Sequence, residues 1–149
     1  SDIYHVNSLY LALTVLFPVA LFVLGNWCVT TLMNGKGKLG EIFMTIMYAM
    51  FPMCLLQLVA LFLSNVLTLD EMTFVYAIET IGTVLLVVYG FIGLVVVHEY
   101  GFGQSIGALL LTVVAMMILV FILMLVFALV ADVWDFFTII TKELMLKYF

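Results

Sequence analysis

Apolar residues dominate four stretches of the chain, each about 22 to 26 residues long, and short polar segments separate them. At a rise of about 1.5 Å per residue, such a stretch crosses the roughly 30 Å hydrocarbon core of a bilayer as a helix. Buried helices of water-soluble domains are usually shorter. The pattern therefore predicts an all-α, polytopic membrane bundle that forms one transmembrane domain over residues 1–149. The four predicted spans cover residues 9–30, 42–63, 74–97 and 106–131.

The C-terminal tail, residues 132–149, has a different pattern. Its apolar residues recur at helical spacing with polar residues opposite, and the polar residues are too many for a membrane crossing. Asp132 can cap the start of such a helix, and acidic residues first with lysines last suit the helix dipole. The tail is therefore predicted to be a separate amphipathic helix at the membrane interface. Its apolar face consists of Val133, Phe136, Phe137, Ile140 and Leu144.

Composition agrees with a membrane protein and limits its partners. Hydrophobic residues make up 68% of the chain and charged residues 9%. The chain has four lysines, no arginine and nine carboxylates, which gives a formal net charge of −5. It therefore has no basic patch that could neutralise phosphates. Nucleic acid is therefore not an expected partner, whereas the lipid bilayer is.

The charged loops indicate an orientation. The positive-inside rule places the loop with Lys36 and Lys38 in the cytoplasm and the acidic turn with Asp70 and Glu71 outside. The tail carries the other two lysines, so a count of lysines alone leaves the two orientations tied. The first loop is short and lies close to its spans, which favours the cytoplasmic placement of that loop.

Glu79 is the residue of the third span that is least favourable in a membrane, since insertion of a carboxylate at full depth in a bilayer costs about 2.5 kcal/mol or more of free energy. Small residues share its helical face and allow another helix to approach closely. We therefore interpret this face as a helix-packing or partner contact. Two alternatives stay open for Glu79: a position near the outer rim that reaches water, and an ion or proton relay. The residues of this predicted contact face are Glu79, Gly82, Thr83, Gly90 and Gly93.

Reactive or ligating constellations are missing from the sequence. The two histidines have no candidate triad partner, and His98-Glu99 lacks the second histidine of a zinc-protease motif. The glycine-rich segments 35–38 and 101–107 do not have the spacing of phosphate-binding loops. Cys28 and Cys54 are predicted to be small buried hydrophobes. The sequence thus predicts no catalytic residue, no cofactor, no metal site and no enzyme.

Five short motifs occur in order along the chain. They are Asn26-Trp27, the segment 31–37 with Gly35-Lys36-Gly37, Tyr48 with Pro52, the aliphatic turn 65–69, and His98-Glu99-Tyr100. With these motifs the chain resembles the Ypt/Rab-interacting protein (Yip) domain family, in its bacterial form, over nearly its whole length.

The resemblance implies five membrane helices, and hence a further helix upstream of Ser1. It implies a cytoplasmic N-terminus, a C-terminus on the far side, and a location in the bacterial plasma membrane. Eukaryotic members bind Rab-type GTPases in vesicle traffic, a role that a bacterium without such GTPases cannot share. The family has no established catalytic residues, so the motif positions are expected to serve packing or partner contact.

The leading functional expectation is a non-enzymatic accessory subunit that binds other integral membrane proteins. Transporter subunits, for instance those of an ABC-type importer, are the candidate partners. Two alternatives stay open: a small transporter or channel that uses Glu79, and a membrane-shaping or trafficking protein that acts through the tail.

Overall fold

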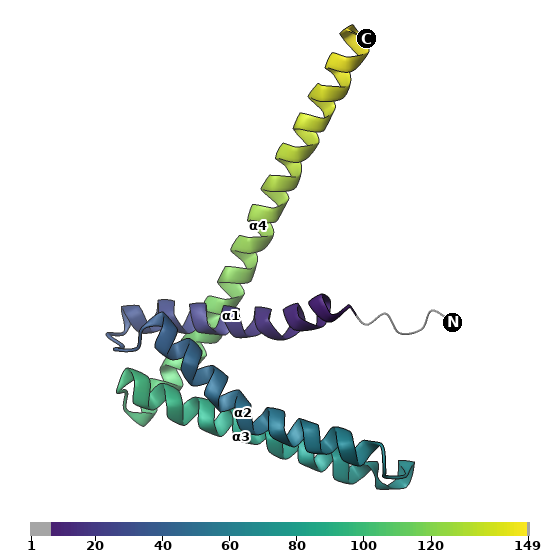
Figure 1. The fold of residues 1–149 in the computed structure, drawn as a ribbon. Helices are drawn as coiled ribbons and strands as arrows, with labels where there is room; N and C mark the ends of the chain where they lie inside the picture. Colours follow the sequence, from purple (N-terminus) through teal and green to yellow (C-terminus); the bar gives the residue numbers. More distant parts are fainter. Residues whose placement is uncertain (1–6, 149) are drawn as a thin grey trace.

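The computed structural model describes residues 7–148, which form long α-helices joined by short connections (Figure 1). Each of the four helices is long and apolar enough to cross a membrane. The protein is therefore an all-α, multi-pass membrane protein, as its hydropathy predicts. The helices are α1 (Ser8–Leu32), α2 (Leu39–Ser64), α3 (Met72–His98) and α4 (Phe102–Tyr148), with a short 3-10 helix, η1 (Leu69–Glu71), before α3.

Local hydrogen bonds explain where the helices begin and end. The Asn7 side chain accepts hydrogen bonds from two backbone N–H groups in the first turn of α1, which is the usual role of an N-cap asparagine. At the start of α2, the Glu41 carboxylate accepts from the backbone N–H of Lys38. Glu99 ends α3 in the left-handed conformation, with φ of 55°, and so turns the chain toward α4.

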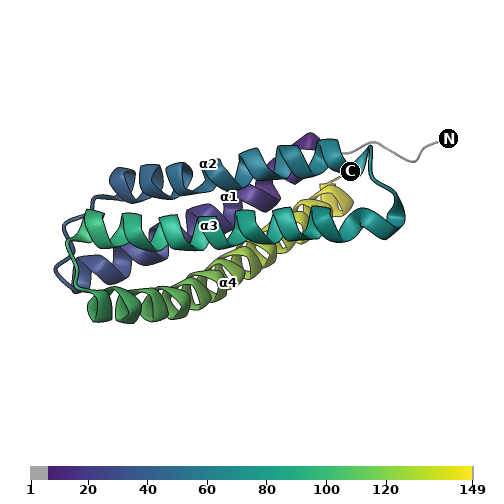
Figure 2. The same cartoon turned by 90° about the horizontal axis from the view of Figure 1, so that it is seen from below.

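The helices α2 and α3 form a hairpin that is closed by the turn 65–71 (Figures 1 and 2). Three glycines of α3 face α2. A Cβ atom at Gly82 would lie 3.5 Å from the Cβ atom of Leu56, and one at Gly93 would overlap the Thr45 methyl group. At Gly90 the nearest atom is the Ala49 Cβ, 3.9 Å away. These glycines allow the two helices to approach closely.

The helices meet most fully at one end of the bundle, which we call the loop end because the segments 33–38 and 99–101 both lie there. Four buried residues form the apolar cluster of this region: Val23, Ile42, Ile46 and Leu94. The opposite end, with the turn 65–71, is the turn end. Toward it, α4 diverges from the α2–α3 hairpin (Figure 1).

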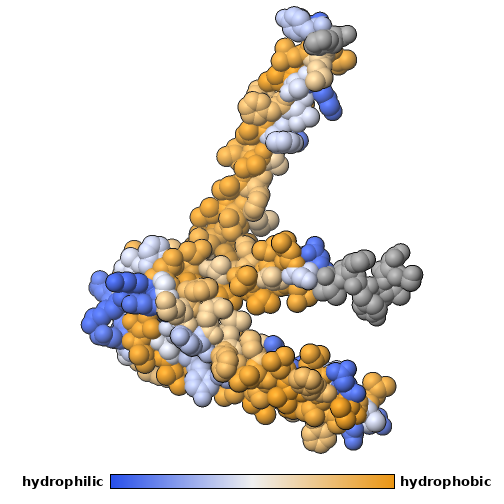
Figure 3. Space-filling model, viewed as in Figure 1, coloured by the Kyte–Doolittle hydropathy of each residue, from blue (hydrophilic) through white to orange (hydrophobic). Residues whose placement is uncertain are grey.

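The predicted fourth span and the C-terminal tail form one continuous helix of 47 residues. Asp132 lies inside this helix and does not cap a separate one, which differs from the expectation. The physical reason is local, because residues 108–148 contain neither glycine nor proline to interrupt the helix. From Met124 to Tyr148 every residue of α4 is exposed. In Figure 3 this part of the molecule projects away from the bundle as a largely apolar shaft.

The two cysteines differ from the expectation of burial. Cys28 and Cys54 are both free thiols and both exposed. Neither thiol is buried against another helix of the described chain.

Candidate functional site

A buried group of polar side chains joins three helices at the loop end. Asn26 of α1, His98 of α3 and Thr112 of α4 have exposed fractions of 1%, 2% and 0%. Burial of polar groups is unfavourable unless each one is hydrogen-bonded, so the partners of these three side chains decide whether they stabilise the fold. We call Asn26, His98 and Thr112 the polar junction.

The hydrogen bonds of the polar junction form one continuous chain. The backbone N–H of Gly37 donates to His98 Nδ1 over 3.3 Å, so this nitrogen must be the unprotonated one. His98 Nε2 then carries the proton and donates to Asn26 Oδ1, 2.9 Å away. Asn26 Nδ2 donates to Thr112 Oγ1 over 3.1 Å, and that hydroxyl donates to the Ala108 carbonyl over 2.7 Å. The assignment requires a neutral imidazole, and with it each donor meets an acceptor.

Tyr100 closes this end of the bundle above His98. Its ring stacks on the imidazole with a centroid distance of 5.3 Å. Its hydroxyl lies 3.3 Å from the Thr30 carbonyl oxygen and 3.2 Å from that of Met33, and it donates to these C-terminal carbonyls of α1. The Thr30 carbonyl also accepts from the backbone N–H of Gly35 over 2.7 Å. Carbonyls at the end of a helix lack partners in the next turn, and Tyr100 supplies a donor there.

Gly35 and Gly37 bring the α1–α2 loop against this site. A Cβ atom at Gly35 would lie 2.6 Å from the Tyr100 hydroxyl and 2.8 Å from His98 Nδ1. A Cβ atom at Gly37 would lie 2.7 Å from His98 Cε1. Only glycine fits at either position without displacement of the buried rings.

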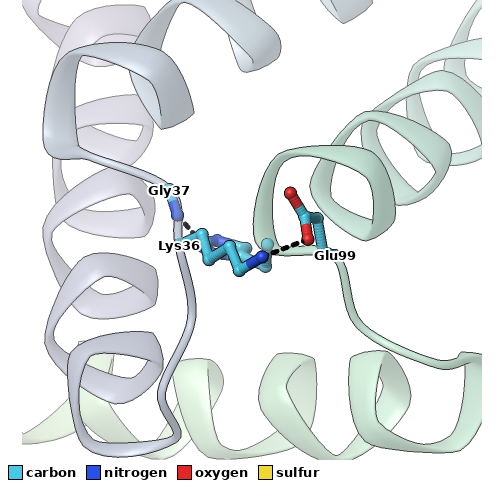
Figure 4. A network of polar contacts seen from close by, with 4 residues as sticks. Lys36, Gly37 and Glu99 are labelled. Carbon is cyan, nitrogen blue, oxygen red and sulfur yellow. Dashed lines mark hydrogen bonds and ion pairs between the residues drawn. The ribbon is translucent and has the colours of Figure 1, made fainter.

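An ion pair spans the two loops at the surface. The Lys36 ammonium group contacts the Glu99 carboxylate, as Figure 4 shows beside the Gly37 backbone. The two side chains are 67% and 61% exposed, and a solvated pair of this kind contributes about 0–1 kcal/mol. The buried junction below it therefore contributes more to the attachment of the loops than the ion pair does.

A small cavity lies beside the polar junction. It has a volume of about 10 Å³ and is lined in part by Asn26, His98, Tyr100 and Ser105. Ser105 Oγ is the one buried side-chain polar atom without a hydrogen-bond partner in the described part of the chain. The volume suits about one water molecule, so the cavity is too small for an organic substrate or a cofactor.

Seven positions of the motifs that support the resemblance lie together at the loop end. They are Asn26, Gly35, Lys36, Gly37, His98, Glu99 and Tyr100. The aliphatic turn 65–69 lies at the turn end, and three further positions lie apart from both. Trp27 is 40% exposed on the outer face of α1. Tyr48 and Pro52 line a shallow groove of the hairpin beside Gly93.

The sequence pattern assigned no site role to three residues that the structure places here, Thr30, Ser105 and Thr112. Thr30 is buried and its hydroxyl donates to the Asn26 carbonyl over 2.7 Å. Threonine and serine bond to their own helix backbone so readily that their presence in a span signals no contact. A weak signal existed in the fourth span, where Ser105 and Thr112 lie seven residues apart and so on one helical face.

The glycine and threonine face of α3 is divided in the structure. Gly82, Gly90 and Gly93 lie against α2, whereas Glu79 and Thr83 are exposed. The Thr83 hydroxyl donates to the Glu79 carbonyl of its own helix. The glycines therefore serve the contact within the chain, and Glu79 stays available at the surface of the hairpin.

The arrangement holds helix ends together, and its polar atoms bond to one another. Within residues 7–148, no three His, Cys, Asp or Glu side chains gather closely enough to hold a metal ion. The four apolar helices and the polar junction describe a multi-pass helical membrane protein whose helices are joined at the loop end by buried hydrogen bonds. Comparison of the chain with protein-family models, curated proteins and solved structures gives no match, so the resemblance to the Yip domain family stays a prediction.

Tyr100 makes the stability of the fold at the loop end dependent on pH. Burial raises the pKa of the Tyr100 phenol above its ordinary value of 10.0. Because the pKa of this phenol is higher in the folded protein than in the unfolded chain, its protonated form stabilises the fold. This contribution is complete at pH values below the pKa of the unfolded chain, and it is lost as the pH rises through the pKa of the folded protein. We expect the melting temperature in detergent, followed by circular dichroism, to decline as the pH rises above about 10, the ordinary pKa of tyrosine. The decline should be smaller in Tyr100→Phe, and an equal decline in both proteins would contradict the prediction.

Proposed function

We propose that this protein is a non-enzymatic, partner-binding subunit of a larger membrane complex. The observation that supports it best is the uncovered distal part of α4, residues 124–148, in which every residue is exposed. Exposed residues in this segment include five large aromatic side chains: Phe127, Trp134, Phe136, Phe137 and Tyr148.

The length of α4 supports a protein partner beyond the lipid. At about 1.5 Å per residue, 47 residues extend roughly 70 Å, whereas the hydrocarbon core is about 30 Å thick. A span that begins near the loop end uses about 20 residues to cross, so lipid tails cannot cover the whole exposed shaft. Apolar surface that extends beyond the bilayer is unfavourable in water and is typical of an interaction site.

The polar junction supports the same function from the other end of the helix. Thr112 bonds to Asn26 of α1, and Ser105 and Ala108 are buried beside it. The first turns of α4 are therefore held by the bundle, while its distal part is presented to other proteins. Such a helix suits a host with several membrane subunits, and an ABC-type importer is the host we propose.

Photo-crosslinking from the native membrane tests this proposal. A photoreactive residue in place of Val130 or Phe137 should yield adducts with one protein of constant mass, because a partner covers the shaft. The same residue in place of Val66, at the exposed turn between α2 and α3, should not yield that protein adduct. Purification in mild detergent should then give a heteromeric assembly of fixed stoichiometry.

Two results would contradict the proposal. One is a set of crosslinks from α4 to lipid alone, which would indicate a helix that rests in the membrane interface. The other is recovery of the full-length protein only as a monomer or homodimer under the mildest conditions of extraction.

A further inference from the structure

A groove lined by three polar side chains, those of Gln57, Ser64 and Glu79, lies on the α2–α3 hairpin near the turn end. Gln57 of α2 and Glu79 of α3 both line it, among mainly apolar neighbours. Gln57 lies seven residues before the last residue of α2, and Glu79 seven residues after the first residue of α3. At about 1.5 Å per residue, both side chains therefore lie roughly 10 Å from the turn end, at the same depth. The apolar lining consists of Cys54, Leu58, Ala60, Leu61 and Val75.

Among the described residues, the side chains of Gln57 and Glu79 have no hydrogen-bond or ion-pair partner. The nearby hydroxyls are engaged by the helix backbone: Ser64 donates to the Leu61 carbonyl and Thr80 to the Tyr76 carbonyl. Within residues 7–148 the one ion pair is that of Lys36 with Glu99, at the other end of the bundle. The Glu79 carboxylate and the Gln57 amide thus face outward together from an apolar surface.

Charge complementarity determines which occupant suits the groove. A carboxylate in an apolar surround favours a cation, and the Gln57 carbonyl oxygen offers a second acceptor to the same group. A second copy of this chain cannot supply that cation at this depth, since its four lysines lie in the 34–38 loop and near the end of α4. A lipid amine lies at the headgroup level, above a site about 10 Å along the helices.

We propose that the groove docks a transmembrane helix of a partner protein that carries a lysine or arginine at the depth of Glu79. The partner cation pairs with the Glu79 carboxylate and donates to the Gln57 carbonyl oxygen, while its apolar residues pack on the groove walls. The inference rests on the proposed function, because it assumes that the protein binds integral membrane partners, and it adds a second contact surface and the chemistry of that contact.

Energy transfer between labelled molecules in vesicles tests the proposal with a defined probe. The full chain carries the donor in phosphatidylcholine vesicles, and the acceptor is on a single-span peptide of leucine and alanine. One peptide has a lysine at the depth of Glu79, a second has leucine there, and a third has the lysine in the other half of the span. We expect the first peptide to associate about fivefold to thirtyfold more tightly than the other two, the range that interhelical hydrogen bonds give in synthetic peptides.

Variants of the chain identify the side chains involved. Glu79→Gln should reduce binding of the lysine peptide to the level of the leucine peptide, and Gln57→Leu should reduce it in part. Thr83→Val is the matched control, because Thr83 is exposed one turn from Glu79 and its hydroxyl is engaged by its own helix. Binding should be unchanged in this control.

Three outcomes would overturn the proposal. Equal association of all three peptides would leave lipid as the only occupant of the groove. Energy transfer between copies of the chain that Glu79→Gln abolishes would assign the groove to a homodimer. Cation flux into vesicles that Glu79→Gln abolishes would assign it to transport. If the lysine peptide does not bind preferentially but the heteromeric assembly is recovered, the groove proposal is wrong and the proposed function stands. If the lysine peptide binds but no heteromeric assembly is recovered, the proposed function is wrong.

Discussion

Replacement of Asn26 by leucine is expected to lower the free energy of unfolding by about 1–3 kcal/mol, because it leaves buried hydrogen-bonding groups without partners. Asn26 accepts from His98 Nε2 and donates to Thr112 Oγ1, so a single side chain connects α1 to both α3 and α4. In the variant, the buried His98 N–H loses its acceptor. The Thr112 hydroxyl keeps its bond to Ala108, so most of the loss is expected at His98.

Denaturation in mixed micelles, followed by circular dichroism, measures this effect. Asn65→Leu is the matched control: Asn65 bonds only to the nearby Leu61 carbonyl and is exposed, so its loss should change stability by about 0.5 kcal/mol or less. A double-mutant cycle of Asn26→Leu with Thr112→Val should give a coupling of roughly 0.6–1.7 kcal/mol, as measured for interhelical pairs in membranes. Equal stability of Asn26→Leu and the wild type would show that the junction contributes nothing.

Replacement of Gly37 by alanine is the second change with a large expected effect. The added methyl group would overlap Val97 and lie 2.7 Å from His98 Cε1 and 2.9 Å from Nδ1. The imidazole cannot move aside without loss of its bond to Asn26. Overpacking of this kind typically costs about 1–3 kcal/mol, and the same range is expected for Gly35→Ala.

A third glycine provides the control for these two variants. A Cβ atom at Gly40, in the first turn of α2, would meet no atom within 4 Å. Gly40→Ala should therefore be neutral or slightly stabilising, since alanine favours the helical conformation. If Gly37→Ala and Gly40→Ala melt at the same temperature, the close packing of the loop against His98 is wrong.

The four apolar spans and their positions could be read from hydropathy alone. Each predicted span lies within an observed helix, because an apolar segment in lipid has few ways to satisfy its backbone other than as a helix. The separate tail helix was predicted from a change of composition at Asp132, and this was wrong. A change from apolar to amphipathic residues does not end a helix unless a residue such as glycine or proline breaks the backbone.

The contacts of the polar junction could not be predicted from the sequence. Asn26 and His98 stand out as polar residues in or beside apolar spans, but they are 72 residues apart, and Asn26 and Thr112 are 86 apart. Helical periodicity assigns each residue to a face of its own helix and contains no information about which faces meet. The glycines 35 and 37 likewise indicate a loop, whereas their contacts with His98 follow from the packing of that loop on α3.

The length and hydropathy of the apolar segments were sufficient to specify a multi-pass helical protein, because they act through local backbone chemistry and through transfer into lipid. Three features depend on how whole helices pack. They are the polar junction at the loop end, the position of the α3 glycines against α2 with Glu79 facing outward, and the uncovered distal part of α4. Packing is a property of residues distant along the chain, so only the three-dimensional arrangement decides it.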